Sequence, residues 1–484
     1  MTKSVQEFRG LAADSREVKP GFLFAALAGT KTDGARFIQD AVTRGAIAVM
    51  GAPEVAEAAQ AAGVRFIPAR NPRLKLAELA AEFYGAQPNI VAAITGTNGK
   101  TSVASFVRQI WAYQGLKAAS LGTLGIDGPS GHSDLGHTTP DPVMLHASLA
   151  RLKGEGVEHL ALEASSHGLD QFRLDGVRIS AAGFTNITRD HMDYHPDFAH
   201  YAKAKLRLFE TLVKDGGVAV VNVDADHAGD FVAAAERRKL QLITVGMRAE
   251  CRRIAEQAPH ADGQDITLRY RGGEHRVALP LAGLFQASNA CVAAALALGL
   301  GAPAEKVFAA LDGLKGAPGR LERVAYARNG APIYVDYAHT PDALVTVLQA
   351  LRPHVRGRLH VVFGCGGDRD RGKRPLMGEA AARYADAVVI TDDNPRSEDP
   401  ASIRREALAG APNAREIGDR AKAIRESIAA LAPGDALVLA GKGHENSQII
   451  GSVAHPFSDR EEAVKAAVAE GGRPAREART MNTA

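Results

Sequence analysis

The sequence contains few cysteines. Its 484 residues include only three, Cys251, Cys291 and Cys365, and these lie far apart. An odd number of widely spaced cysteines argues against a disulfide framework, which is typical of small secreted proteins. We therefore expect the protein to act in a reducing cytoplasm.

The sequence also lacks a charge imbalance, a long apolar run and an internal repeat. The formal net charge is only +3 at pH 7 and basic residues form no sustained run, so nucleic-acid binding is not indicated. The first residues contain no apolar signal core, and no segment is long and apolar enough to span a membrane. With 46% hydrophobic and 23% charged residues, the composition is typical of a soluble globular protein.

Strand-like and helix-like segments alternate along the chain, which predicts an α/β fold with mainly parallel sheets. The length predicts about three domains at ~150 residues each. We expect a small N-terminal α/β domain, a central P-loop-type domain and a C-terminal Rossmann-like domain, at residues 1–88, 89–317 and 318–484. The predicted strands are 21–27, 46–50, 90–94, 159–163, 181–186, 218–223, 333–336, 359–363, 387–391 and 436–439, and the predicted helices are 37–44, 74–84, 103–111 and 287–300. We also expect a hairpin over 266–281, a linker over 313–319 and a disordered tail after Gly471.

A glycine-rich loop between the strand 90–94 and the helix 103–111 predicts a phosphate site. The loop contains Gly96, Thr97, Asn98, Gly99, Lys100, Thr101 and Ser102. Glycines let backbone N–H groups approach phosphate oxygens, and the helix N-terminus attracts anions. Lys100 would neutralise the β- and γ-phosphates of a nucleoside triphosphate, and the Thr101 hydroxyl would hold Mg²⁺.

The loop departs from the general Walker pattern, because Ile94 stands where that pattern has its first glycine. An ordinary glycine turn is the alternative interpretation. We favour the phosphate site, since glycines, a lysine and two hydroxyls converge where a helix N-terminus favours anions.

Acidic and histidine residues follow two further predicted strands. Glu163 ends one strand, and His191 lies in a loop after another, so both are expected beside the phosphate loop. Glu163 suits Mg²⁺, whereas a histidine ligand is unusual for this ion. For His167 and His195, hydrogen-bonded loop positions are an equally good interpretation. On spacing alone, Lys203, Lys205 and Arg207 of the helical segment 200–209 are solvated surface charges.

Three strand ends of the last domain carry polar loops. They are residues 364–370, 392–396 and 441–445. The first resembles a dinucleotide-binding fingerprint only weakly, because Arg369 occupies the third glycine position. Together the loops offer arginines for carboxylates and acidic groups for an ammonium, which suits an amino-acid ligand.

The phosphate loop, the segment around His191 and the Asp393-Asn394-Pro395-Arg396 motif together resemble the Mur ligase family over essentially the whole chain. Within that family the chain is similar to the ligases that add meso-diaminopimelate to UDP-N-acetylmuramoyl-L-alanyl-D-glutamate in peptidoglycan synthesis. The resemblance implies that ATP activates a substrate carboxylate as an acyl phosphate, which the amine of the amino acid then attacks. It implies a cytoplasmic monomer that uses Mg²⁺ and binds neither nucleic acid nor membrane.

The resemblance also implies a role for each matching residue. UDP-sugar binding falls to Ser15, Arg16, Thr30, Lys31 and Thr32. Muramoyl-dipeptide binding falls to Thr138, Thr139, Ser165, Gln171 and Arg173. ATP binding adds Asn289, Arg320, Asp336 and His339 to residues 96–102. Diaminopimelate binding falls to Arg369, Asp393, Asn394, Pro395, Arg396, Gly441 and Glu445. Magnesium binding falls to Glu163, His191 and a carbamylated Lys205 beside Thr101, and Lys100, Glu163, His191 and Lys205 are the implied catalytic residues.

Two positions depart from the family pattern and leave the UDP-sugar site less defined. His137 stands where some relatives have asparagine, and Ala13 where a larger apolar residue often contacts uracil. The alternatives are a ligase for lysine or for folate glutamates, or a regulatory nucleotide-binding protein without ligase activity. The Asp-Asn-Pro-Arg motif argues against lysine, the first domain argues against folate, and the intact Lys100, Glu163 and Lys205 argue against a purely regulatory protein.

Overall fold

The computed structural model describes residues 5–29, 33–249 and 252–475. The chain divides into two compact units, Met1–Glu250 with Val292–Lys306, and Cys251–Cys291 with Val307–Ala484. Within the described residues, no helix combines the length and the apolar character needed to cross a bilayer.

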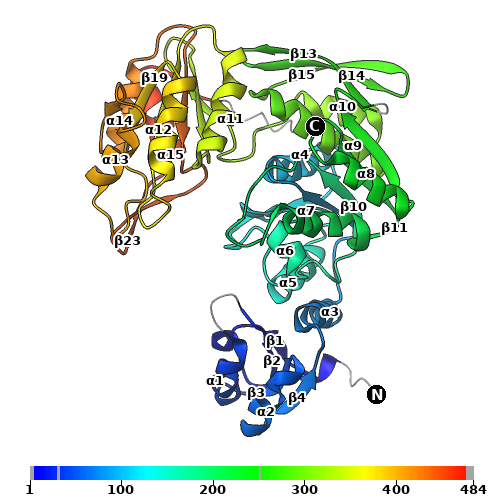
Figure 1. The fold of residues 1–484 in the computed structure, drawn as a ribbon. Coiled ribbons are helices and arrows are strands. Elements are labelled where there is room, and N and C mark those ends of the chain that lie inside the picture. The colour runs from blue at the N-terminus through cyan, green and yellow to red at the C-terminus, as the bar shows by residue number, and fades with distance from the viewer. Residues whose placement is uncertain (1–4, 30–32, 250–251, 476–484) are drawn as a thin grey trace. The chain divides into compact units, whose positions relative to one another are not determined.

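The first unit begins with a small parallel sheet (Figure 1). Its strands, in spatial order, are β1 (Gly10–Ala12), β2 (Phe22–Ala26), β3 (Ala46–Gly51) and β4 (Arg65–Pro68). One face packs against α1 (Ile38–Thr43) and α2 (Ala56–Ala61), and the other against α3 (Pro72–Tyr84). The side chain of Asn71 caps α3 at its start, and Gly85 ends it with a positive φ of 65°.

A larger sheet forms the rest of this unit. Its strand order is β12-β11-β10-β5-β9-β6-β7-β8. The strands are β5 (Ile90–Thr95), β6 (Ala118–Gly122), β7 (Gly125–Gly128), β8 (Gly131–Ser133), β9 (His159–Glu163), β10 (Ile179–Phe184), β11 (Val213–Asn222) and β12 (Gln241–Gly246). All neighbours pair in parallel except β6 with β7 and β7 with β8.

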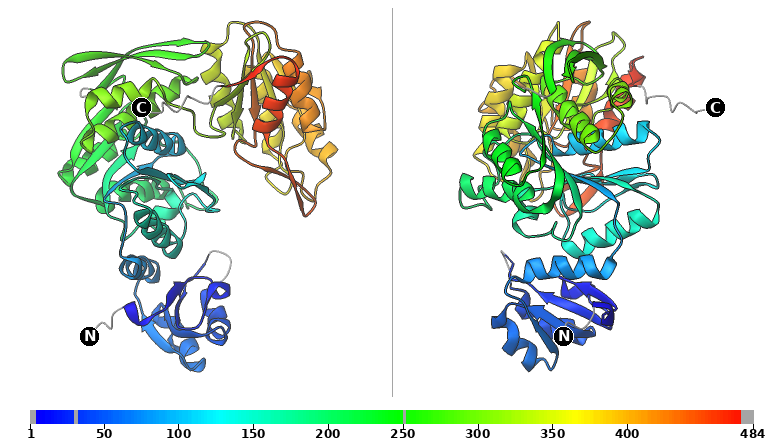
Figure 2. Two further views of the ribbon diagram at one scale, coloured as in Figure 1. Left: turned by 180° about the vertical axis from the view of Figure 1, so that it is seen from behind. Right: turned by 90° about the vertical axis from the view of Figure 1, so that its right-hand side faces the viewer.

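Helices cover both faces of this larger sheet (Figures 1 and 2). One face packs on α5 (Pro142–Gly154), α6 (Ser166–Asp170), α7 (Phe198–Arg207) and α8 (Ala228–Arg237). The other packs on α4 (Lys100–Tyr113) and on the second half of α9 (Leu284–Gly299). Because both faces are covered, the central strands are almost continuously apolar, as in β5, where five of six residues are buried.

The second unit starts with an antiparallel meander and ends in a second α/β sheet. The meander consists of β13 (Arg252–His260), β14 (Gly263–Tyr270) and β15 (Gly273–Leu279). Helix α10 (Ala304–Leu311) begins in the first unit and ends in the second. The sheet order is β20-β19-β18-β21-β17-β16-β24, in which the first five strands are parallel and the last two are antiparallel to their neighbours.

Two sets of helices sandwich this sheet, as expected for a Rossmann-like fold (Figure 2). Its strands are β16 (Glu322–Tyr326), β17 (Pro332–Asp336), β18 (Leu359–Phe363), β19 (Ala387–Ile390), β20 (Arg415–Glu416), β21 (Ala436–Ala440) and β24 (Arg473–Pro474). One face packs on α11 (Pro341–Leu351), α12 (Lys373–Tyr384) and α13 (Pro400–Leu408). The other packs on α14 (Arg420–Ala429) and α15 (Asp459–Ala469). A separate hairpin, β22 (Ser447–Ile450) and β23 (Val453–Pro456), follows β21.

The predicted α/β class with mainly parallel sheets is confirmed. Each predicted strand and helix matches an element of that type, and β14 with β15 forms the predicted hairpin around Arg271 and Gly272. No helix or strand lies between α10 and β16, where the linker was expected. The tail prediction is wrong for Arg473 and Pro474, which pair with β16 as β24, and its residues from 476 onward lie outside the described part. The domain boundaries at 88 and 317 remain predictions.

The fully buried pair of Arg420 and Asp459 yields a stability prediction. Arg420 Nε and Nη2 each donate to an Asp459 carboxylate oxygen at 2.7 Å, and Nη2 also donates to the Ala440 carbonyl at 3.0 Å. Arg420→Met should lower the free energy of unfolding by about 3–5 kcal/mol, because it leaves a buried carboxylate without a partner. Urea denaturation monitored by circular dichroism measures this.

The exposed pair Arg415 and Glu426 provides the control for that experiment. Arg415→Met should change the free energy of unfolding by at most about 1 kcal/mol. The double variant of Arg420→Met with Asp459→Leu should recover part of the loss. A loss for Arg420→Met no larger than that for Arg415→Met would contradict the assignment.

Candidate active site

The phosphate loop connects β5 to α4 and requires its glycines. Gly96 has a φ of 148°, and a Cβ there would lie 1.9 Å from Thr185 Oγ1, so no larger residue fits. Gly99 precedes α4 with a φ of 87°. Lys100 is the first residue of α4, and its Nζ donates to the carbonyls of Gly96 at 2.9 Å and Thr97 at 2.8 Å. The loop is therefore folded around its own lysine at a helix N-terminus, as an anion site requires.

Lys205, near the end of α7, contacts the same loop. Its Nζ donates to the Gly96 carbonyl at 2.7 Å and lies 4.6 Å from the centre of the Tyr201 ring. Lys205 is only 1% exposed, so the interpretation of this residue as a solvated surface charge is wrong. Burial, reinforced by the charge of Lys100, holds the pKa of Lys205 well below its usual range. A neutral amine is thus favoured at this position.

The other two basic residues of α7 do not share this environment. Lys203 is exposed, as the spacing predicted. Arg207 forms a partly buried ion pair with Asp175 at 2.6 Å. Helix α7 therefore presents a single buried lysine to the phosphate loop.

Glu163, at the end of β9, is buried and held by hydroxyl and amide donors. Thr101 Oγ1 donates to Glu163 Oε2 at 3.0 Å. Thr123 donates to Oε2 through its hydroxyl at 3.1 Å and to Oε1 through its backbone N–H at 2.9 Å. The sequence did not single out Thr123, because it lies in a short turn between β6 and β7 without a motif of its own. Two of the predicted metal-binding residues, Thr101 and Glu163, are thus in direct contact.

The predicted muramoyl-dipeptide residues form a chain of hydrogen bonds attached to Glu163. The hydroxyls of Thr138 and Thr123 are 2.9 Å apart. Thr139 Oγ1 donates to the Glu163 carbonyl at 2.9 Å and accepts from Ser165 Oγ at 3.0 Å. The structure therefore brings Thr138, Thr139 and Ser165 together beside Glu163, and their role in binding the dipeptide stays a prediction.

His191 lies in the loop after β10, in the left-handed region with a φ of 55°. Burial lowers the pKa of its imidazole, Asp190 opposes that shift, and the charges of Lys100 and Lys205 lower it further. The His191 ring lies 6.2 Å from the ring of Tyr201, which Lys205 also contacts. A neutral imidazole is the form that can bind a metal ion.

Two more histidines surround His191 in an aromatic cluster. The His167 ring is 4.8 Å from His191 and 5.7 Å from His195, and it lies 4.0 Å from the Tyr194 ring. Burial, with the neighbouring histidines, lowers the pKa of His167 to about 4. His167, in α6, and His195, in the loop before α7, both pack within this cluster. The interpretation of the two as hydrogen-bonded loop residues is wrong, because His167 is helical and His195 Nε2 is buried without a hydrogen-bond partner among the described residues.

The predicted UDP-sugar residues are only partly described. Ser15 is buried at the start of the 3₁₀ turn Ser15–Glu17. The exposed Arg16 forms an ion pair with Asp14. Thr30, Lys31 and Thr32 lie outside the described residues.

Four predicted ATP residues lie in the second unit, where Gln286 connects two of them. Asn289 Nδ2 donates to Gln286 Oε1 at 3.0 Å, and Gln286 Nε2 donates to the Arg320 carbonyl at 3.5 Å. The Arg320 guanidinium stacks 4.6 Å from the centre of the Tyr337 ring. Asn289 and Arg320 therefore belong to one cluster.

Asp336 and His339 follow β17 in the same unit. The Asp336 carboxylate is buried and accepts backbone N–H groups of Leu321 at 2.6 Å and Ala338 at 2.7 Å. Burial raises the pKa of Asp336 and lowers that of His339. Asp336 thus fixes the turn that carries its neighbour Tyr337, the stacking partner of Arg320.

The predicted amino-acid pocket lies where β18, β19 and β21 end. Asn394 Nδ2 donates to Glu445 Oε2 at 2.9 Å. Lys442 Nζ, which is fully buried, donates to that same oxygen at 3.0 Å and to Asn394 Oδ1 at 3.2 Å. Lys442 lies in the strand-end loop 441–445, but the sequence assigns it no role, because its burial cannot be recognised from the sequence. Gly441 has a φ of 114°, and a Cβ there would lie 2.8 Å from a carboxylate oxygen of the buried Asp393.

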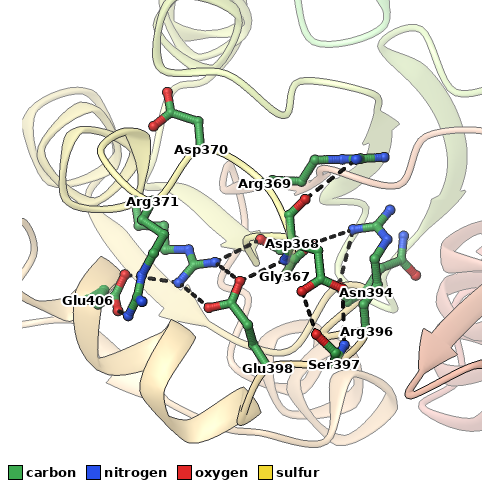
Figure 3. Close-up of polar contacts among 12 residues, drawn as sticks. Gly367, Asp368, Arg369, Asp370, Arg371, Asn394, Arg396, Ser397, Glu398 and Glu406 are labelled. Carbon is green, nitrogen blue, oxygen red and sulfur yellow. Dashed lines mark hydrogen bonds and ion pairs between the residues drawn. The ribbon is translucent and has the colours of Figure 1, made fainter. Parts of the chain in front are cut away.

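Arg396 has an unusual backbone conformation that a neighbouring hairpin stabilises. Its φ is 51°. Its N–H donates to the Ile449 carbonyl of β22 at 3.1 Å, and its Nη1 donates to the Gly367 carbonyl at 2.8 Å (Figure 3). Arg369 makes a weaker contact, with Nη1 3.5 Å from the Asp368 carbonyl. Hydrogen bonds therefore fix both the backbone and the side chain of Arg396, the residue predicted to bind a carboxylate.

A buried guanidinium joins the two loops behind Arg396. Arg374 is fully buried and donates to both Glu398 oxygens, at 2.8 and 3.0 Å, and to Glu406 Oε2 at 2.9 Å. Figure 3 shows Glu398 also accepting from the backbone of Asp368, while the Asp368 carboxylate binds Ser397. The hydrogen bond from Arg374 lowers the pKa of Glu398 to about 2. Sequence reasoning missed this network, since its members are dispersed over four segments.

The fold and these clusters define a three-segment, nucleotide-dependent ligase architecture. Family models for the Mur ligase family catalytic domain, the Mur ligase middle domain and the Mur ligase glutamate ligase domain match residues 7–84, 94–297 and 319–443. The chain therefore belongs to the Mur ligase family.

Named relatives agree with that assignment. The UDP-N-acetylmuramoyl-L-alanyl-D-glutamate–2,6-diaminopimelate ligase of Bradyrhizobium diazoefficiens is 57% identical over 469 residues, covering 96% of this chain and 95% of the relative. A solved structure of a ligase with the same name is 35% identical, with a TM-score of 0.73 and coverage of 97% and 100%. The MurF ligase of Thermotoga maritima in complex with ADP shares the fold, with 17% identity, a TM-score of 0.62 and coverage of 97% and 99%.

The position of Lys100 gives a prediction for ATP use. Lys100→Ala should reduce kcat by roughly 10²–10³, about 3–4 kcal/mol, because the triphosphate loses a charge aimed at the transferred group. ADP release in a coupled assay measures this. Lys117→Ala, which alters a lysine outside the loop, is the control and should retain activity. Near-normal turnover in folded Lys100→Ala protein would contradict the phosphate-loop assignment.

Proposed function

We propose that this protein is the ATP-dependent ligase that adds meso-diaminopimelate to UDP-N-acetylmuramoyl-L-alanyl-D-glutamate in peptidoglycan synthesis. The observation that carries the proposal is the cluster of polar side chains at the ends of β18, β19 and β21. There Arg396 is pre-positioned for a carboxylate, and Glu445 is oriented by Lys442 and Asn394 for an ammonium. The high identity to relatives with this name over nearly the whole chain supports it.

The reaction uses the first unit for activation. A carboxylate oxygen of the glutamyl residue attacks the γ-phosphorus of ATP, and the bond to the β-phosphate oxygen breaks to release ADP. The amine of diaminopimelate then attacks the acyl phosphate, and inorganic phosphate and a proton leave as the amide forms. Lys100 faces the triphosphate, where negative charge accumulates. The residues 138, 139 and 165 position the dipeptide next to Glu163.

The residues beside the phosphate loop fit a magnesium ion. Thr101 and Glu163 place hard oxygen donors 3.0 Å apart, which is the donor chemistry that Mg²⁺ prefers. Among the described residues, no three His, Cys, Asp or Glu side chains form a metal site by themselves. His191 and a carbamylated Lys205 would complete the set, since carbamylation turns the buried amine into an oxygen donor. Bound Mg²⁺ would neutralise the phosphates.

The pKa of Lys205 supports its carbamylation, because only the neutral amine adds CO₂ to form a carbamate and release a proton. Lys205→Ala should lose nearly all activity, and a short carboxylic acid in the assay should restore part of it. Lys203→Ala, on the exposed side of the same helix, should keep normal activity. A bare ammonium in a high-resolution crystal structure of the nucleotide-bound enzyme would contradict the carbamate.

We also propose that the protein is a cytoplasmic monomer. The buried, free thiol of Cys365 suits a reducing compartment. Light scattering coupled to size-exclusion chromatography tests the monomer, and a stable dimer would contradict it.

Selectivity for the amino acid tests the proposed function most directly. Lysine lacks the distal carboxylate of diaminopimelate and would leave Arg396 without its partner. Sites built for a polar group reject analogues that lack it by roughly 10⁴–10⁵. We expect a preference of this order in kcat/KM, measured by ADP release across a panel of amino acids with the UDP-linked dipeptide present.

The variant Arg396→Ala should lose activity mainly with diaminopimelate, so the ratio of kcat/KM for diaminopimelate to that for lysine should fall. Arg383→Ala, on the same domain but outside the pocket, is the matched control. Equal kcat/KM values for lysine and diaminopimelate in the wild type would favour a lysine-adding ligase. ATP binding without any amino-acid-dependent ADP release would favour a regulatory protein.

A further inference from the structure

Arg73 lies in the first turn of α3 and contacts two distant segments of the first unit. Its Nη2 donates to the Ala28 carbonyl at 2.7 Å, and its Nη1 donates to Gln171 Oε1 at 3.3 Å. Arg73 belongs to no sequence motif, and the family resemblance gave it no role. The contact of Arg73 with Gln171, just after α6, arises from tertiary packing and is not visible in the sequence.

A second guanidinium shares the same acceptor. Arg173 donates to Gln171 Oε1 through Nη2 at 2.8 Å and through Nε at 3.3 Å. Two positive side chains therefore converge on one neutral amide oxygen. Over the described parts of the chain, neither Arg73 nor Arg173 takes part in an ion pair within 4.0 Å. All three side chains are partly buried, so water screens the two charges only in part.

The electrostatics of Arg173 show the same excess of positive charge. Burial lowers its pKa, Asp141 opposes that shift, and the charge of Arg73 lowers the pKa again. Gln171 cannot relieve the repulsion, because its Nε2 is used to donate to the Tyr194 hydroxyl at 3.0 Å. Such an arrangement is more stable when an anion lies between the guanidiniums.

The paired guanidiniums are connected to the reacting end of the site. Arg173 Nη1 donates to the Thr139 carbonyl at 2.7 Å, and Thr139 Oγ1 donates to the Glu163 carbonyl at 2.9 Å. Thr139 alone therefore connects the Arg173 guanidinium to the backbone of Glu163. A group bound between Arg73 and Arg173 would belong to the part of the substrate next to the activated carboxylate.

The helix that carries Arg73 is fixed in place at its other end. Gln87, just beyond α3, donates through Nε2 to the Gly176 carbonyl at 3.1 Å and accepts from Arg178 N–H at 2.9 Å. Helix α3 also packs along α5. The Arg73 guanidinium is thus positioned before any ligand binds, which reduces the entropy lost on binding.

We propose that Arg73 and Arg173 together bind one of the two carboxylates of the glutamyl residue, the one that ATP does not activate. Arg73 is then a substrate-binding residue. This inference rests on the proposed function, because it requires the muramoyl dipeptide to occupy the site around Thr139 and Ser165. The terminal glutamyl residue carries two carboxylates a few bonds apart. One must reach the γ-phosphate of ATP, and the other enters a partly buried site and needs its own cationic partner.

Direct binding of UDP-muramoyl dipeptide to Arg73→Gln, measured by calorimetry, tests the proposal without turnover. The Kd should rise roughly 10- to 100-fold relative to wild type, the range expected for losing charge-assisted hydrogen bonds. Arg73→Lys should lie between the two, since it keeps the charge but not the two-pronged geometry. Arg70→Gln, an exposed neighbour just before the helix, is the matched control and should bind as wild type does.

Two substrate analogues distinguish the possible partners of Arg73. In the first analogue a carboxamide replaces the non-activated carboxylate. Wild type should bind this analogue more weakly than the natural dipeptide, and the Arg73→Gln substitution should not weaken its binding any further. Arg73→Gln could still weaken binding of the carboxamide analogue but leave binding of a muramoyl dipeptide without UDP unchanged. That result would assign Arg73 to the diphosphate and overturn the proposal. A loss that persists with both analogues would make its role purely structural and also overturn it.

The melting temperature of Arg73→Gln and its affinity for ATP show whether the variant is folded. If Arg73→Gln unfolds, the Kd values of Arg73→Lys for the same two analogues distinguish binding of the carboxylate, binding of the diphosphate and a purely structural role. Absence of ADP release by wild type with dipeptide and diaminopimelate would be a failure of the proposed function. Normal wild-type turnover combined with an unchanged Kd for Arg73→Gln would be a failure of this inference alone.

Discussion

The carbonyl of Gly96 is the point on which the catalytic half of the protein depends. It accepts from Lys100 at 2.9 Å and from Lys205 at 2.7 Å. Two ammonium groups cannot share one buried acceptor without a cost, and the charge of Lys100 adds to burial in lowering the pKa of Lys205. Burial and the nearby charge of Lys100 thus favour the neutral amine that carbamylation requires, and the hydrogen bond from Lys205 connects α7 to the phosphate loop.

The rest of the first unit is arranged around charges that the protein itself does not fully balance. Among the described residues, the Glu163 carboxylate accepts from the hydroxyls of Thr101 and Thr123 and from the Thr123 backbone N–H. Arg73 and Arg173 share a neutral amide where a carboxylate would suit them better. A site that joins two carboxylate-bearing substrates with a triphosphate gains from such incomplete pairing, since ligands supply the missing charges when they bind.

The amino-acid pocket of the second unit follows the opposite principle. Its supporting cations form ion pairs within the protein: Arg374 with Glu398 and Glu406, and Lys442 with Glu445. Buried pairs of this kind contribute more to defining a geometry than to overall stability. Beside them, Arg396 is held in a left-handed conformation by its hydrogen bonds to the Ile449 and Gly367 carbonyls.

The sequence by itself determined the α/β class, the phosphate loop and the polar loops at the strand ends, whereas the resemblance to the Mur ligase family implied most of the individual site residues. The first three features are local: alternating apolar segments predict buried parallel strands, and polar motifs at strand ends meet at one edge of a sheet. Tertiary structure alone decided the state of Lys205, whose neighbours in sequence are surface charges, and the roles of Thr123, Lys442 and Arg374. It also decided the pairing of Arg73 with Arg173 across some hundred residues. Burial and charge coupling arise from packing between distant segments, and no spacing within one segment records them.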